Sequence, residues 1–140
     1  MVVYIGSDAR LRTWPFDAAK PGFHVTEVST QDEAVKSQFS KPHVYYAGAF
    51  EGCGCGFQYG REYPEVEDDR EGLAAAEACR AGIEAYIEEA LRLQPAVEIY
   101  ACWSGDEAES PSAKRALDHP LFPNGFRERE FLVVGHSADG

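Results

Sequence analysis

Hydrophobic and polar residues are arranged along the chain in a pattern typical of alternating strands and helices. Residues 2–5 are β-branched and aromatic, and residues 23–28 alternate apolar and polar, which is typical of a half-buried strand. Residues 43–50 are almost wholly apolar after the first position, which indicates a central strand covered on both faces. Two further apolar runs, residues 97–103 and 130–135, predict additional strands.

The clearest helix is predicted for residues 70–93. At 100° per residue, small and apolar residues gather on one face, while Glu and Arg residues gather toward the other. The predicted inner face comprises Gly72, Ala76, Cys79, Ile83, Tyr86, Ile87 and Ala90. Pro95 ends the helix because it restricts the residue before it.

Two short helices are also indicated. Thr30 and Glu33 have the spacing of a capping box, and a helix of about two turns should follow them. Ser110 is a suitable N-cap and Pro111 suits a first helical position, which predicts a helix up to residue 117.

The order of these elements predicts the fold class. Residues 23–28 and 43–50 flank a helix, as do residues 43–50 and 97–103, and such crossovers join parallel strands. We therefore expect one α/β domain over residues 1–140. Its sheet should be mixed but largely parallel, with four or five strands, one long helix and one or two short helices.

The loop at residues 8–22 contains Trp14 and Phe16 on either side of Pro15, and a Pro-Gly pair follows at residues 21 and 22. Two interpretations remain open for this pair. The aromatic side chains could close the end of the sheet, or they could line a ligand pocket.

Composition narrows the possible partners. The chain has 140 residues, of which 44% are hydrophobic and 26% charged, as in ordinary globular proteins. A net charge of −11 argues against binding to nucleic acid or to an anionic membrane, because such partners need clustered Lys and Arg. The N-terminus lacks the pattern of a signal peptide, and no run approaches the roughly 20 apolar residues of a membrane span. We expect a cytoplasmic protein with reduced thiols.

The most distinctive stretch follows the predicted central strand. A CxC motif, formed by Cys53 and Cys55, follows Glu51 there. Gly54 lies between the two cysteines, and Gly56 comes directly after them. The intervening glycine lets the backbone bend, so that both sulfurs can meet one metal ion or each other. A disulfide in so small a ring would be strained and easily reduced. The motif therefore predicts a redox-active or metal-holding thiol site, with Glu51, Gly54 and Gly56 as ligand-binding candidates.

Zinc is the metal that such thiols would take, but the pair is incomplete. Zinc prefers four nitrogen or sulfur ligands, and no second CxxC or HxxxH pair is present. The residues that could complete the site are scattered along the chain, namely Cys102, His24, His119 and His136. The alternative is that small cysteines simply fit a glycine-rich turn. We expect Cys79 and Cys102 to fill the core.

A second candidate site depends on strand direction. If the first, third and fourth strands are parallel, their carboxyl ends share one rim of the sheet, where ligands bind in α/β folds. That rim would carry Asp8, Glu51 with the two cysteines, Asp106 and Glu107. Carboxylates beside a thiol could perform acid–base or nucleophilic chemistry, with His136 as a further participant.

Three functions follow, in order of preference. The first is a small protein with a thiol site at Cys53 and Cys55. The second is a non-catalytic binding or interaction module, in which the glycine-rich loop is only a turn and an exposed apolar patch or groove marks the binding surface. The third is a hydrolase or transferase that uses a loop cysteine with Asp106 and His136.

Overall fold

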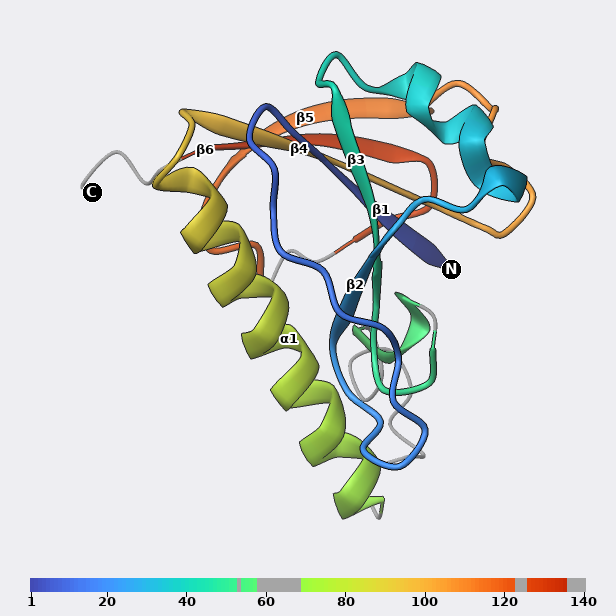
Figure 1. The fold of residues 1–140 in the computed structure, drawn as a ribbon, viewed down its shortest axis with the longest axis vertical. Coiled ribbons are helices and arrows are strands. Elements are labelled where there is room, and N and C mark those ends of the chain that lie inside the picture. The colour runs from blue at the N-terminus through green and yellow to red at the C-terminus, as the bar shows by residue number, and fades with distance from the viewer. Residues whose placement is uncertain (53, 58–68, 123–125, 136–140) are drawn as a thin grey trace.

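In the computed structural model, residues 1–52, 54–57, 69–122 and 126–135 are described (Figure 1). The predicted β-rich first half, long helix and C-terminal strands are all present. In chain order the elements are β1 (Val2–Ser7), β2 (His24–Glu27), the 3₁₀ helix η1 (Thr30–Gln38), β3 (His43–Gly48), the 3₁₀ helix η2 (Gly54–Phe57), α1 (Arg70–Leu91), β4 (Ala96–Cys102), β5 (Ala113–Asp118) and β6 (Glu130–Gly135).

One six-stranded sheet organises the chain, in the order β2-β3-β1-β4-β6-β5. β1 lies between β3 and β4 and is antiparallel to both, so that Tyr4 pairs with Tyr46 on one side and Tyr100 on the other. β2 is antiparallel to β3, and β4 is antiparallel to β6. The β5–β6 pair is parallel. The protein is thus a single small mixed α/β domain.

The prediction of a largely parallel sheet of four or five strands was wrong. β3 and β4 do run in the same direction and are joined through α1, but β1 inserts between them and makes both ladders antiparallel. β2 and β3 were expected to be parallel. The connection through η1 instead returns the chain beside the strand it left, which gives an antiparallel pair.

The short helix predicted for residues 110–117 was also wrong, because that segment contains β5. The strand pairs in register with β6, from Ala113 opposite Glu130 to Asp118 opposite Gly135. Its side chains alternate between exposed and half-buried positions over residues 114–118, as a two-residue period requires. Non-local pairing therefore overrides the local helix-start signal of Ser110 and Pro111.

α1 covers one face of the sheet (Figure 1). Six of the seven predicted inner-face residues are buried, whereas Gly72 is half-buried. The buried residues of the helix are Ala76, Cys79, Ile83, Tyr86, Ile87, Ala90 and Leu91. All of these except Ala76 pack with Val3, Ile5 and other residues of the sheet in the larger of two core clusters. No helix among the described residues is long and apolar enough to cross a membrane.

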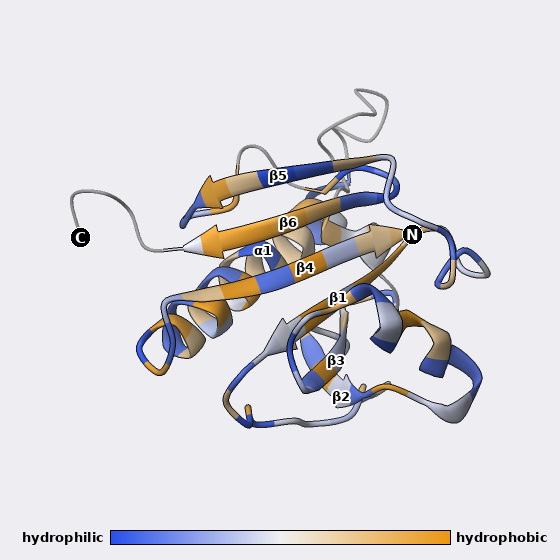
Figure 2. Cartoon of the chain, turned by 90° about the horizontal axis from the view of Figure 1, so that it is seen from above, coloured by the Kyte–Doolittle hydropathy of each residue, from blue (hydrophilic) through white to orange (hydrophobic). Residues whose placement is uncertain are grey.

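The opposite face of the sheet has a smaller core under η1. Val35 from η1 is fully buried there, together with Tyr4 and Tyr100 from the central strands. Figure 2 shows η1 over the part of the sheet near β1 and β3, with α1 on the far side of β4 and β6. The domain therefore has three layers over part of the sheet and two over the rest.

Candidate functional site

The glycine-rich stretch closes the end of the sheet on the side of α1. Gly54 donates its backbone N–H to the carbonyl oxygen of Met1 at 3.0 Å, and Arg80 Nη1 donates to the carbonyl oxygen of Phe57 at 3.1 Å. A Cβ on Gly54 would lie 2.7 Å from Val3 Cγ2, closer than real Cβ contacts allow. This glycine is therefore needed for packing, whatever else the loop does.

Cys55 differs from the buried cysteines in its surroundings. It is half-buried, and its Sγ accepts a hydrogen bond of 3.0 Å from the terminal amino group of Met1. Cys79 and Cys102 are buried, and burial raises the pKa of both thiols, that of Cys102 to about 12. Cys53, the other half of the predicted thiol pair, lies outside the described residues.

The predicted carboxylate rim divides between the two ends of the sheet. Because β1 is antiparallel to β3 and β4, Asp8 lies at the opposite end from Glu51 and Asp106, and pairs with Lys41 Nζ at 2.7 Å. The prediction that Asp8 shares one rim of the sheet with Glu51 and Asp106 was therefore wrong. His136 lies outside the described residues.

Glu107, the remaining carboxylate of the predicted rim, is buried and hydrogen-bonded within the protein. Its Oε2 accepts the N–H of Gly105 at 2.9 Å, and its Oε1 accepts the hydroxyl of Tyr4 at 3.2 Å. Both oxygens are thus occupied by donors from the protein. The carboxylate fastens the connection after β4 to the central strand.

Two of the residues suggested as zinc ligands, His24 and His119, lie beside backbone carbonyl oxygens. His24 Nδ1 lies 3.0 Å from the carbonyl oxygen of Gly22, and His119 Nε2 lies 3.0 Å from that of Glu84. Within the described ranges, no three His, Cys, Asp or Glu side chains are grouped so as to hold a metal ion.

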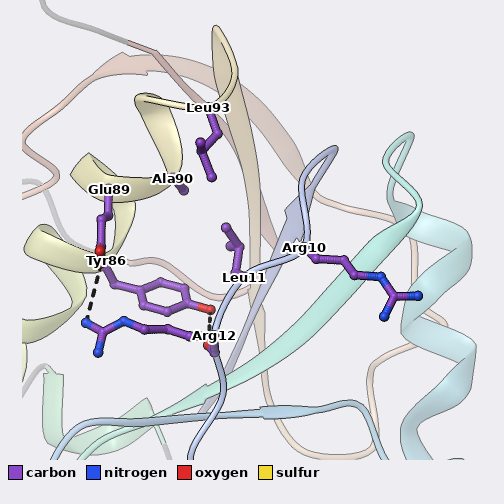
Figure 3. Close-up of a pocket in the computed structure, with 7 residues that line it drawn as sticks. All are labelled: Arg10, Leu11, Arg12, Tyr86, Glu89, Ala90 and Leu93. Atoms are coloured by element: carbon purple, nitrogen blue, oxygen red, sulfur yellow. Dashed lines mark hydrogen bonds and ion pairs between the residues drawn. The ribbon is translucent and has the colours of Figure 1, made fainter.

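A crevice of about 180 Å³ lies where the loop after β1 passes the last turns of α1 (Figure 3). Its walls include Leu11 from the loop and Ala90 from the helix, with Leu93 just beyond the helix end. Leu93 is 65% exposed although it is a large apolar residue. The remaining lining residues are Arg10, Arg12, Tyr86 and Glu89.

Two tyrosine hydroxyl groups form hydrogen bonds with the backbone of the loop beside the crevice. Tyr86 Oη donates to the carbonyl oxygen of Arg12 at 2.8 Å, and Tyr45 Oη accepts the N–H of Leu11 at 2.9 Å. Burial raises the pKa of Tyr86, so its hydroxyl keeps the proton that it donates. Each bond fixes one position of the loop against the core.

An ion pair and an aromatic contact complete the rim. Arg12 Nη2 lies 3.4 Å from Glu89 Oε2, and the Arg12 guanidinium lies 4.9 Å from the centroid of the Trp14 ring. Trp14 packs in turn on Tyr86 and forms a β-bridge to Val25. Figure 3 shows Arg10 extending away from the other lining side chains, so its charge does not face the crevice.

Little in the sequence pattern predicts this crevice. Leu11 is a lone apolar residue between two arginines, and Leu93 falls after the end of the helix. Neither belongs to a periodic pattern, and only the fold brings them together. Of the two aromatic residues in this loop, Trp14 packs against the core, whereas Phe16 is 41% exposed.

Comparison with protein-family models, with curated proteins and with solved structures found no match to this chain.

Proposed function

We propose that the protein is a binding module that receives one apolar group in the crevice between Leu11 and Leu93. The observation that carries this proposal is the open apolar surface at the crevice, where Leu93 remains 65% exposed. An exposed apolar groove is the feature that distinguishes the binding-module hypothesis from the thiol hypothesis.

The size of the crevice limits the group that it can take. Pockets for drug-sized ligands usually measure about 300–1,000 Å³, whereas this one measures about 180 Å³. A single aromatic ring or a branched aliphatic group is therefore a better match than an extended ligand. Such a group could belong to a small molecule or to a side chain of a protein partner.

The rim favours a group without net charge. Arg12 and Glu89 are opposite charges 3.4 Å apart, so their fields largely cancel at the entrance. Both side chains are more than half exposed, and such pairs contribute little to stability. They can therefore separate to meet polar atoms next to a bound apolar group.

The proposal is tested by titrating the protein with 3-methylbutan-1-ol, a neutral branched probe, in methyl-detected NMR. We expect saturable shifts at Leu11, Ala90 and Leu93. The variant Leu93→Asp should remove them without unfolding the protein, because this side chain is mostly exposed. Trp103→Asp, at another exposed apolar site, is the matched control and should bind as the wild type does. Equal shifts in both variants would argue against the crevice.

A thiol site at Cys55 is the second candidate function. It is favoured by one observation, the half-buried position of Cys55 beside the amino group of Met1, at 3.0 Å from Sγ. A positive charge near sulfur stabilises the thiolate, which is the reactive form. In this proposal Cys55 acts with Cys53 as a redox pair or as part of a metal site. Four reduced thiols and no bound metal in protein purified without reductant would count against both forms.

A further inference from the structure

Arg129 occupies an unusual backbone conformation for a residue with a side chain. Its φ angle is 55°, in the left-handed region where Gly and Asn are much more common. The backbone of Arg129 is hydrogen-bonded to β4 and to the residue just before β5. Its N–H donates to the carbonyl oxygen of Ala101 at 2.7 Å, and its carbonyl oxygen accepts the N–H of Ser112 at 2.7 Å. The backbone alone would thus favour a different residue here.

The guanidinium group of Arg129 has no counterion in the part of the chain that the structure describes. Its Nε is buried and lacks a hydrogen-bond partner there. Arg115 also has an unpartnered buried Nε, but its Nη2 pairs with Glu130 Oε1 at 2.7 Å. An unpaired buried donor is costly, and here it occurs in a chain of net charge −11 that offers many carboxylates.

A cavity of about 290 Å³ opens at this point and is lined by Ser112, Glu128 and Arg129. The Ser112 hydroxyl donates a long hydrogen bond of 3.2 Å to the carbonyl oxygen of Arg129. Because this oxygen already accepts the backbone N–H of Ser112 at 2.7 Å, the hydroxyl can turn to another acceptor at little cost. Arg129 and Ser112 therefore line the cavity, and both have side chains that donate hydrogen bonds.

We propose that Arg129 and Ser112 form a binding site for the carboxylate group of a small ligand. Guanidinium and carboxylate groups match in geometry, and charge-assisted hydrogen bonds between them are strong. Glu128 lines the same cavity, and its negative charge disfavours a dianion such as phosphate more than a singly charged carboxylate. This site is independent of the apolar crevice, because the two share no lining residue.

Acetate is the probe that tests the proposal, followed through backbone amide shifts at constant ionic strength. We expect saturable shifts at Ser112 and at residues 128–130, and sodium chloride at the same ionic strength should not reproduce them. Arg129→Asn should weaken acetate binding by about tenfold or more, the loss expected for one charge-assisted hydrogen bond. This variant suits the backbone, because Asn tolerates a positive φ angle.

Arg127→Asn removes an exposed arginine from the same turn and is the matched control, so it should leave acetate binding unchanged. Arg129→Gly provides a second variant that is compatible with the backbone if Arg129→Asn fails to fold. Equal shifts in wild type and in either Arg129 variant would overturn the site. Saturable binding of inorganic phosphate without binding of acetate would overturn the carboxylate assignment.

Discussion

Tyr86 Oη donates a hydrogen bond of 2.8 Å to the carbonyl oxygen of Arg12, and this contact joins α1 to the loop that follows β1. Tyr86 is one of the inner-face residues of the helix, and it is only 3% exposed. The bond therefore places the loop backbone against the core, and it sets the spacing between Leu11 and Leu93 across the crevice.

Removal of the Tyr86 hydroxyl should weaken the attachment of the loop to α1 and so lower the stability of the protein. In Tyr86→Phe the carbonyl oxygen of Arg12 loses its donor, and we expect the free energy of unfolding to fall by about 1 kcal/mol. Glu89→Gln is the control because it breaks only the exposed ion pair with Arg12, with an expected loss of less than about 0.5 kcal/mol. Urea unfolding measures both values. A Tyr86→Phe variant as stable as Glu89→Gln would contradict the role given to the hydroxyl.

The glycine-rich loop should tolerate substitution poorly at its packed position. A Cβ on Gly54 would meet Val3 Cγ2 at 2.7 Å and the carbonyl oxygen of Met1 at 3.1 Å, so Gly54→Ala should cost about 1–3 kcal/mol of unfolding free energy. Gly22→Ala is the matched control, since the nearest atom to its added Cβ would be 3.9 Å away. Thermal unfolding of the two variants compares them. Equal midpoints would show that Gly54 is not needed for packing.

The buried tyrosines should make the protein sensitive to alkali. Burial raises the pKa of Tyr100 from 10.0 to about 12, and it also raises those of Tyr4 and Tyr86. Well below pH 10 these tyrosines are protonated in both the folded and the unfolded state and contribute no pH dependence. Above pH 10 the unfolded chain loses protons that the folded protein retains, so stability should fall as pH rises.

The expected slope for each such tyrosine approaches about 1.4 kcal/mol per pH unit. Urea unfolding at several pH values between 8 and about 11.5 measures the slope, and Tyr100→Phe should make it shallower above pH 10. An unchanged slope in this variant would contradict a raised pKa at Tyr100, whatever the variant does to stability at pH 8.

The cysteines should differ in reactivity. Cys79 and Cys102 are at most 1% exposed, and burial raises the pKa of both thiols. Cys55 is half-buried and lies beside an amino group. Iodoacetamide labelling of the folded protein, read by peptide mass spectrometry, should therefore modify Cys55 well before the two core cysteines. Protection of Cys55 equal to that of Cys79 would remove the thiol proposal for this residue.

Local periodicity predicted some elements well and others not at all. Most of the inner face of α1 was predicted correctly, because the 3.6-residue period of apolar positions is visible in the sequence of the helix. β5 was missed because its partner is β6, and the pairing of Ala113 with Glu130 is not visible in the local sequence. The position of β1 between β3 and β4 was likewise not predictable, because strand order depends on long-range pairing.

Among the candidate sites, too, some residues were recognisable in the sequence and others come together only in the fold. Cys53, Cys55 and Asp106 were singled out by residue type, and their use as a site remains a proposal. The crevice depends on Leu11 and Leu93, which carry no motif and meet only through the fold. The unusual backbone of Arg129 likewise follows from contacts with Ala101 and Ser112, which are far from it in the sequence.

The measurement that tests the binding proposal most directly is a set of intermolecular NOEs between 3-methylbutan-1-ol and the protein. The crevice is lined by methyl groups of Leu11, Ala90 and Leu93, so NOEs from the probe should reach these three residues together. NOEs confined to another exposed apolar side chain, such as Val133, or no saturable NOEs at all, would contradict the proposal.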